Sequence, residues 1–125
     1  MNVLVVEDEA LIRELLVDVL ADAGLDVAAA PDAEAALRVV GPAGEAVRPP
    51  CVLVTDIDLG RGMDGLALAA KMRCRWPGMG VVVMTGKPAN LDGRPSDPRE
   101  VRLFKPFALA RLAAAVHDLM GRSGR

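Results

Sequence analysis

The sequence lacks most of the features that mark secreted, membrane-spanning or nucleic-acid-binding proteins. Tyrosine is absent, and there are only two phenylalanines, one tryptophan and two cysteines. The formal net charge is −2, so no basic excess gives a general affinity for nucleic acid. After Met1 the apolar run covers only Val3 to Val6, which is too short for a signal peptide. No stretch approaches the ~20 apolar residues that span a bilayer. We therefore expect a cytoplasmic protein that contacts neither membrane nor nucleic acid.

The two cysteines, Cys51 and Cys74, have neither metal-ligand spacing nor the pattern of a disulfide framework. Because free cysteine is commonly buried, we expect two buried, reduced thiols. The 125 residues are 52% hydrophobic and 26% charged, which suits one folded domain with a largely aliphatic core. We assign this domain to residues 1–121 and a flexible tail to residues 122–125.

Short apolar runs alternate with segments in which apolar residues recur at helical spacing. This alternation indicates βαβ units and a parallel sheet covered by helices on both faces. Right-handed crossovers place the carboxyl ends of all the strands along one edge of such a sheet. Strands are expected at Asn2–Val6, Leu25–Ala30, Cys51–Thr55, Met79–Met84 and Val101–Phe104, and helices over about 11–23, 33–40, 65–76 and 109–120.

The segment between Thr85 and Lys105 departs from this alternation, because it lacks apolar periodicity. Prolines and glycines leave room for little more than one helical turn there. We predict a loop with at most a short piece of helix and with above-average mobility. The residues that interrupt a helix are Gly86, Pro88, Gly93, Pro95 and Pro98.

Five residues with reactive or charged side chains lie at the expected carboxyl edge. Glu7 and Asp8 follow the first strand, Asp56 ends the third, and Thr85 and Lys105 follow the fourth and fifth. Singly, Asp8 could cap a helix, Thr85 could be a turn residue and Lys105 could be a solvated charge. Their joint placement instead favours a functional site.

The expected acidic cluster needs a cation. Two carboxylates ~5 Å apart repel each other by ~3 kcal/mol at an effective dielectric constant of about 20. Lys105 supplies only one positive charge against Glu7, Asp8 and Asp56. Mg²⁺ suits a shallow, partly hydrated carboxylate site. An anionic oxygen of Asp56 beside such an ion is a candidate nucleophile toward phosphorus.

Four separated motifs carry a family resemblance. The segments "VLVVEDEALIR", "TDIDLGRGMDGL", "VVVMTG" and "FKPF" occur in this order and together span most of the chain. They resemble the receiver domain of two-component response regulators. The resemblance implies a flavodoxin-like, doubly wound α/β fold with five parallel strands in the order 2-1-3-4-5. In this chain the fourth crossover helix should be short or missing.

The resemblance also implies a role for each residue of the cluster. Asp56 would accept a phosphoryl group from the phosphohistidine of a histidine kinase or phosphotransfer protein. Asp8, Asp56 and the backbone carbonyl of Asp58 would hold Mg²⁺, and Glu7 would act through a bound water. Lys105 would pair with a phosphoryl oxygen.

The remaining implications concern the response to phosphorylation. Thr85 would hydrogen-bond a second phosphoryl oxygen, and its movement would bias a two-state surface that a downstream protein reads. Pro106 would follow a cis peptide bond. Such a domain is a phosphoacceptor that assists its own phosphorylation and dephosphorylation, and is not otherwise an enzyme.

The chain departs from the family pattern at several positions. Arg102 stands where an aromatic residue usually lies, and Phe104 is next to the lysine instead. Activation is therefore expected to be read through ordering of the 86–100 loop. In the segment after Asp56, Gly60 replaces a usual proline, and Arg61 resembles an insertion.

Three further residues lie close to the expected site. Asp58 and Lys87 would flank the phosphoryl group and modulate its hydrolysis, although Lys87 could equally be a solvated charge. Asp64 is interpreted as a helix N-cap.

Two other functions fit parts of the pattern. A receiver-like binding module that is never phosphorylated could share the fold, but such modules typically lose one of the site residues. Haloacid-dehalogenase phosphatases also carry Asp-x-Asp at a strand end. In that family the motif lies on the first strand, whereas here Glu7 and Asp8 precede Asp56.

Overall fold

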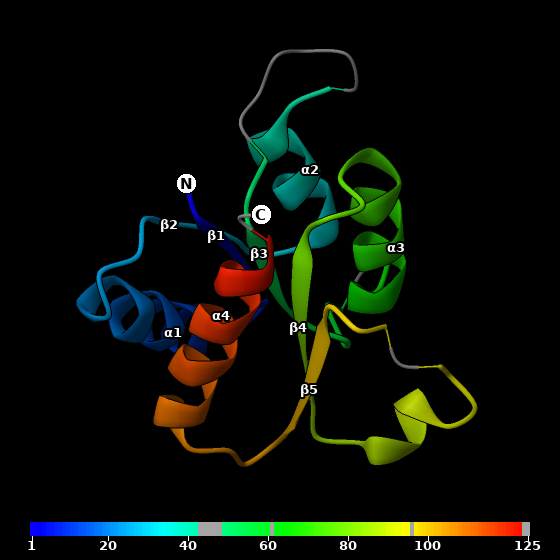
Figure 1. The fold of residues 1–125 in the computed structure, drawn as a ribbon. Helices are drawn as coiled ribbons and strands as arrows, with labels where there is room; N and C mark the ends of the chain where they lie inside the picture. Colours follow the sequence, from blue (N-terminus) through cyan, green and yellow to red (C-terminus); the bar gives the residue numbers. More distant parts are fainter. Residues whose placement is uncertain (43–48, 61, 96, 124–125) are drawn as a thin grey trace.

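The computed structural model describes residues 1–42, 49–60, 62–95 and 97–123. Strands and helices alternate along these residues, apart from one short 3₁₀ helix, η1, at Pro88–Leu91 (Figure 1). The strands are β1 (Val3–Val6), β2 (Val27–Ala30), β3 (Val52–Asp56), β4 (Gly80–Thr85) and β5 (Glu100–Phe104). The α-helices are α1 (Ala10–Asp22), α2 (Ala33–Val40), α3 (Gly65–Arg75) and α4 (Leu109–Ser123).

The strands form one parallel sheet in the order β2-β1-β3-β4-β5. This order confirms the predicted flavodoxin-like topology. In the register, Val6 of β1 is opposite Thr55 of β3, and Asp56 is opposite Met84 of β4. The strands therefore end together, and the chain segments that follow them meet at one edge.

Two apolar layers cover the sheet. α2 and α3 lie on one face, and α1 and α4 lie on the other (Figure 1). Alternate residues of each strand point to opposite layers, as in Leu53 toward α2 and α3 and Val54 toward α1 and α4. Both faces of the central strands are thus buried, which explains their nearly continuous apolar sequences.

Helix ends follow the local sequence. Asp32 and Asp64 each accept a hydrogen bond from a backbone N–H in the first turn of the following helix, at 2.8 Å. Gly24, with a φ of 88°, lies just beyond the end of α1, in a conformation that favours glycine. α4 continues to Ser123, two residues past the predicted domain boundary, and residues 124–125 lie outside the described part of the chain.

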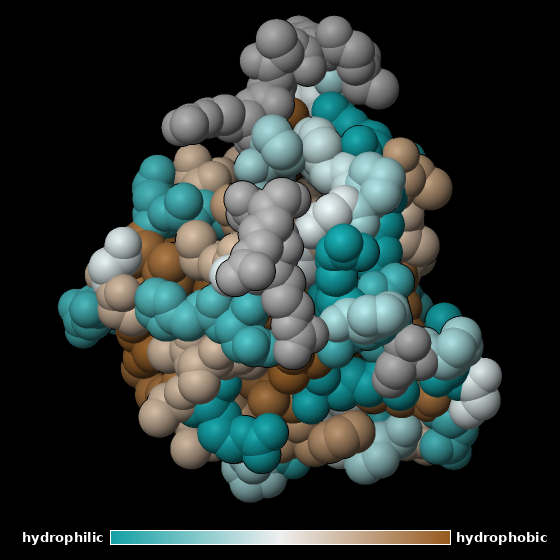
Figure 2. Space-filling model, viewed as in Figure 1, coloured by the Kyte–Doolittle hydropathy of each residue, from teal (hydrophilic) through white to brown (hydrophobic). Residues whose placement is uncertain are grey.

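Among residues 86–95 and 97–99, which the structure describes, the crossover from β4 to β5 has no α-helix, as predicted. Its only helical piece among the described residues is η1, which buries Leu91 against the α2–α3 layer. The predicted mobility of this segment stays a prediction. Figure 2 shows the face of the molecule that is turned to the viewer in Figure 1. Hydrophilic residues cover much of the right half of that face, over α3, β5 and the segment beside them.

The expectation of two buried thiols is wrong. Both cysteines are free, but Cys74 is exposed and Cys51 is partly exposed. α3 turns Leu68, Ala69 and Met72 toward the core, so Cys74 lies on its outer side. Cys51 precedes β3 at the amino-terminal edge of the sheet, where cover is incomplete. Within the described residues, no helix has both the length and the apolar content needed to cross a bilayer.

Candidate functional site

Three carboxylates converge at the carboxyl edge of the sheet. Glu7, Asp8 and Asp56 each offer an oxygen, and these atoms lie within 4.8 Å of one another. The register of β1 against β3 brings them together, because both strands end at the same level. Glu7 and Asp56 are 1% and 6% exposed, whereas Asp8 is exposed. The cluster therefore has a buried floor and one ligand open to solvent.

Lys105 brings a positive charge to this cluster from the end of β5. Its Nζ lies 2.7 Å from Asp56 Oδ2 and 3.7 Å from Glu7 Oε1. Its backbone N–H donates to Thr85 O at 2.8 Å, and the peptide bond to Pro106 is cis. Burial would lower the pKa of Lys105, but the hydrogen bond and charge of Asp56, together with Glu7, raise it. In this structure Lys105 is an ion-paired residue of the site.

Burial changes the titration of Glu7 in this cluster. Burial is the main reason that the pKa of Glu7 is raised from 4.5 to about 7. The hydrogen bond from the N–H of Glu9 and the charge of Lys105 lower this pKa, whereas Asp8 and Asp56 raise it further. Its Oε2 accepts the Glu9 N–H at 3.0 Å. Its Oε1 is buried and has no hydrogen-bond partner among the described residues.

These residues fit a divalent cation. Three oxygen donors within reach of one another, one of them a buried oxygen without a hydrogen bond, match the preference of Mg²⁺ for carboxylates and retained water. The single charge of Lys105 leaves the cluster with a negative excess when all three acids are ionised. Asp58 is exposed and lies outside the cluster, but its N–H donates to Asp56 Oδ1 at 3.2 Å. Its carbonyl as a ligand stays a prediction.

Thr85 is completely buried at the end of β4, and its hydroxyl is occupied. The hydroxyl donates to Lys87 O at 3.2 Å and accepts from Lys87 N at 3.0 Å. It also accepts from Asn90 Nδ2 at 3.4 Å. The predicted bond from Thr85 to a phosphoryl oxygen therefore requires an exchange of partners.

The outlying predicted residues have different surroundings. The Lys87 side chain is exposed, which fits both a solvated charge and a residue that flanks the phosphoryl group. Arg102 contacts Glu100 and two loop carbonyls instead of the acidic cluster. Asp64 is the N-cap of α3, as predicted. The inference about Arg61 falls outside the described residues.

Sequence reasoning missed two residues that hold the cluster in place. Arg13 of α1 donates from Nη1 to Glu7 O at 2.9 Å, which fixes the turn after β1. Gly65, the first residue of α3, lies so close to β3 that a Cβ there would collide with the carbonyl oxygen of Asp56. The close approach of Gly65 could have been predicted, because this glycine comes one residue after a helix N-cap and nine residues after Asp56. Nothing in the sequence indicates the contact of Arg13 with Glu7.

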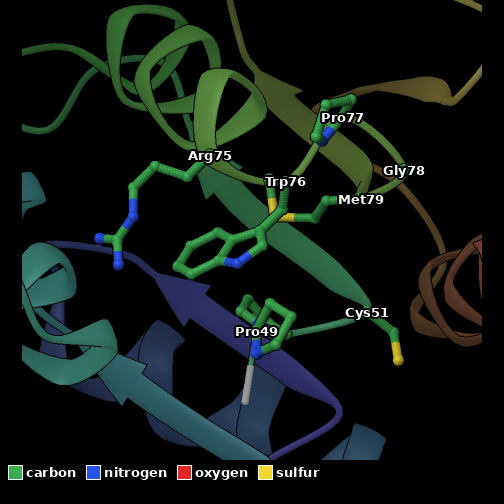
Figure 3. A pocket seen from close by; sticks show the side chains of 8 residues that line it. Pro49, Cys51, Arg75, Trp76, Pro77, Gly78 and Met79 are labelled. Atoms are coloured by element: carbon green, nitrogen blue, oxygen red, sulfur yellow. The ribbon is translucent and has the colours of Figure 1, made fainter. Parts of the chain in front are cut away.

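A second hollow lies at the opposite, amino-terminal edge of the sheet. Its volume is about 300 Å³, and Pro49, Cys51, Trp76 and Met79 are among its lining residues (Figure 3). The guanidinium of Arg75 lies 4.3 Å from the centre of the Trp76 ring. The described lining residues include no carboxylate, and the hollow begins where β3 and β4 begin, so it is separate from the acidic cluster.

The sheet order together with acids after β1 and β3 and a lysine after β5 defines a receiver-type α/β domain. The family model described as "Response regulator receiver domain" matches residues 3–117. The chain belongs to this family, which is that of two-component signalling.

Three of the curated relatives are regulatory proteins of Pseudomonas aeruginosa. The chain is 37% identical to the response regulator protein FleR, with 97% of the chain and 24% of FleR covered. It is 33% identical to the two-component response regulator PhoP, with 98% and 53% covered. The transcriptional regulatory protein AruR is 37% identical, with 73% and 36% covered. The chain thus spans about a quarter to a half of the length of these relatives.

Solved structures agree with this assignment. A response regulator receiver protein from Sinorhizobium medicae superposes with a TM-score of 0.83 at 28% identity, covering 97% of this chain and 94% of that one. The receiver domain of NtrX from Brucella abortus has a TM-score of 0.78 at 29% identity, with 96% and 98% covered.

Proposed function

We propose that this domain takes a phosphoryl group from the phosphohistidine of a histidine kinase or phosphotransfer protein onto Asp56, and thereby switches a protein–protein interaction. The observation that carries the proposal is the ion pair of Lys105 with Asp56 at 2.7 Å, inside a group of three carboxylates. Membership of the receiver family supports the phosphoacceptor role in general.

The transfer needs little from the protein beyond position and charge. One oxygen of the Asp56 carboxylate attacks phosphorus, the P–N bond breaks, and its electron pair stays on the imidazole nitrogen. Asp56 becomes an acyl phosphate. Lys105 can then pair with a phosphoryl oxygen, because its ammonium already lies within hydrogen-bond distance of Asp56. The buried floor of the site strengthens these electrostatic contacts.

Mg²⁺ is the proposed cofactor. Asp8, Asp56 and the Asp58 carbonyl would hold it, and Glu7 would act through a bound water. When bound, the ion neutralises charge on the transferring oxygens and offsets repulsion among the acids. Glu7 itself must ionise to help hold the ion, and its raised pKa makes this step dependent on pH.

Hydrolysis of the acyl phosphate at the same site would reset the domain. Asp58 and Lys87 are proposed to modulate its rate, since the Asp58 backbone lies against Asp56 and Lys87 follows Thr85 by two residues. The domain thus assists its own phosphorylation and dephosphorylation. It needs no catalytic group beyond Asp56, Thr85 and Lys105.

The setting of the domain is proposed on sequence grounds. We assign the receiver domain to residues 1–121, in the cytoplasm, with an upstream kinase or phosphotransfer protein and a downstream protein as partners. The net charge of −2 argues against nucleic-acid binding by these residues themselves.

Phosphorylation by acetyl phosphate with Mg²⁺, followed by intact-mass measurement, tests the proposal. The expected result is one adduct of about 80 Da, the mass of a phosphoryl group, which is absent from Asp56→Asn. Chelation of Mg²⁺ should abolish it.

Asp64→Asn is the matched control, because it removes a nearby carboxylate whose role is to cap α3 and asparagine caps equally well. This variant should still be phosphorylated. An adduct that persists in Asp56→Asn would overturn the assignment of the acceptor. No adduct in any variant would favour a receiver-like binding module, and turnover of a generic phosphate ester would favour the phosphatase alternative.

A further inference from the structure

The residues between β4 and β5 that the structure describes, 86–95 and 97–99, are held mainly by polar contacts, and Arg102 bonds to two backbone carbonyls in the carboxyl half. We propose that Arg102 is a positioning residue that fixes this half to β5. Phosphorylation then moves only the amino half, at 87–90, while the carboxyl half stays in place. The movement of the amino half rests on the proposed phosphorylation of Asp56, whereas the role of Arg102 does not.

The guanidinium of Arg102 binds both the segment and its own strand. Its Nη2 lies 3.1 Å from Arg94 O and 3.0 Å from Pro95 O, and its Nε lies 2.7 Å from Glu100 Oε2. We call these three contacts the Arg102 tether. A planar guanidinium can satisfy a carboxylate and two carbonyls at once, which an aromatic ring at this position cannot do.

Glu100 anchors the tether to a helix. Its side chain is 6% exposed, and its Oε1 accepts from Arg73 Nη2 of α3 at 2.9 Å. The carboxylate is thus shared by two arginines, one from α3 and one from β5. Bonds between charged groups with little exposure are stronger than ordinary surface ion pairs. The carboxyl half of the segment is therefore linked to one strand, β5, and through Glu100 to one helix, α3.

The amino half is held at the phosphorylation site instead. A hydroxyl has one donor and two acceptor positions, and all three positions of Thr85 are used by Lys87 and Asn90. A phosphoryl oxygen only accepts hydrogen bonds. Thr85 can therefore bind it only by giving up the bond to Lys87 O, which loosens the turn that leads into η1.

Between the two halves, Leu91 is 6% exposed and packs in the α2–α3 layer. Its carbonyl accepts the N–H of Arg94 at 3.1 Å, so this anchor is linked directly to the tethered residues. No aromatic residue takes part, because Arg102 occupies the usual position and Phe104 is 47% exposed. Motion that begins at Thr85 should therefore end near Leu91.

Amide hydrogen exchange measured residue by residue by NMR tests the tether without phosphorylation. The Arg94 N–H donates to Leu91 O, and opening this turn in the wild type also breaks the bond from Arg102 to the Arg94 carbonyl. In Arg102→Ala the Arg94 amide should therefore exchange about tenfold faster, because a hydrogen bond to a charged group contributes roughly that factor. Arg99→Ala is the matched control, since the Arg99 side chain is exposed and makes no hydrogen bond or ion pair with the residues that the structure describes. It should change this rate less than about twofold.

Arg102→Lys covers the case in which Arg102→Ala does not fold. It keeps a positive charge beside Glu100 but loses the planar fork, so the Arg94 amide should still exchange several-fold faster than in the wild type. Equal rates in the Arg102 and Arg99 variants would overturn the tether.

Beryllofluoride with Mg²⁺ tests the coupling, with fluorine NMR reporting whether the mimic is bound at Asp56. In the wild type, exchange at the Lys87 and Asn90 amides should change while that at Arg94 stays constant; in Arg102→Ala the change should reach Arg94. Bound mimic with an unchanged Lys87 amide would overturn the coupling alone. Absence of binding would overturn the proposed function, and the coupling with it, whereas the tether is judged by the first measurement.

Discussion

The two crossovers that flank β4 solve the same packing problem in different ways. From β3 to β4 the chain forms α3, which buries Leu68, Ala69 and Met72 on the sheet. From β4 to β5 the residues that the structure describes form one short helix, η1, and Leu91 is its buried residue. The first crossover is held by an apolar face, and the second by hydrogen bonds to Thr85 and Arg102.

This difference separates stability from response. Apolar burial is spread over many contacts and is lost only when the domain unfolds. Hydrogen bonds to a single hydroxyl can be exchanged one at a time. The crossover that contains α3 therefore provides a rigid support for Asp56, whereas the crossover that contains η1 can change when Asp56 is modified.

The largest expected effect comes from removing one leucine from each crossover. Leu68→Ala should destabilise the domain by about 4 kcal/mol and Leu91→Ala by about 2 kcal/mol, because Leu68 is completely buried in the core and Leu91 lies in a short segment that can collapse around the gap. Urea unfolding followed by circular dichroism measures both losses. Equal losses would mean that the crossover containing η1 packs as firmly as α3.

Gly65→Ala tests the contact between α3 and β3. Its added Cβ would collide with the carbonyl of Asp56, so a backbone shift costing about 3 kcal/mol is expected, together with slower phosphorylation of Asp56. Gly78→Ala, at the other end of this crossover, has no atom within 4 Å of the new Cβ and should change stability by less than about 0.5 kcal/mol. A normal phosphorylation rate in Gly65→Ala would contradict the close approach.

The pH dependence of Mg²⁺ binding tests the site that both crossovers adjoin. Since the pKa of Glu7 is raised to about 7, the proton must leave before Glu7 can help hold the ion. Mg²⁺ affinity, measured by calorimetry, should then be about tenfold weaker at pH 6 than at pH 8.

The same shift has a defined sign for stability. Folding favours protonated Glu7, so the metal-free protein should lose stability as the pH rises from about 4.5 to about 7, the interval between the unfolded and folded pKa values. Glu7→Gln stays neutral and should lose both this dependence and that of Mg²⁺ affinity. A slope that is unchanged in Glu7→Gln would assign the titration to another group.

The smallest expected effect compares one capping carboxylate in each crossover. Asp64→Ala removes the N-cap of α3 and should cost about 1 kcal/mol. In the crossover that contains η1, Asp97 accepts a similar bond from the Arg99 N–H, but this bond does not cap a helix. Asp97→Ala should cost less than about 0.5 kcal/mol of global stability in the same urea titration. The reverse order would contradict the contrast between the two segments.

The arrangement of the strands could be predicted from sequence because burial on both faces leaves a direct pattern. Runs such as Val81–Met84 have no other stable place in a small domain, and the prolines after Thr85 exclude a long α-helix. The meeting of Glu7, Asp56 and Lys105 follows once these strands are parallel, since parallel strands end at one edge.

The polar partners could not be predicted, because they depend on the path of the segment at 86–99. Nothing near Arg102 in sequence indicates that it binds the carbonyls of Arg94 and Pro95, and Glu100 reaches Arg73 across 27 positions. The occupied hydroxyl of Thr85 likewise depends on where Asn90 lies in space. The prediction of a buried Cys74 is wrong because residue type indicates the average burial of cysteine, but not which side of a helix a particular cysteine occupies.

The stacking of Trp76 on Arg75 has a practical consequence for spectroscopy. This indole is the single tryptophan of the chain, tyrosine is absent, and it lies at the edge of the sheet away from Asp56. Its fluorescence should thus stay constant when an ion or a phosphoryl group binds at the opposite edge, yet change when α3 separates from the sheet. The chain thus carries its own reporter of denaturation, which should not respond to changes at the acidic cluster.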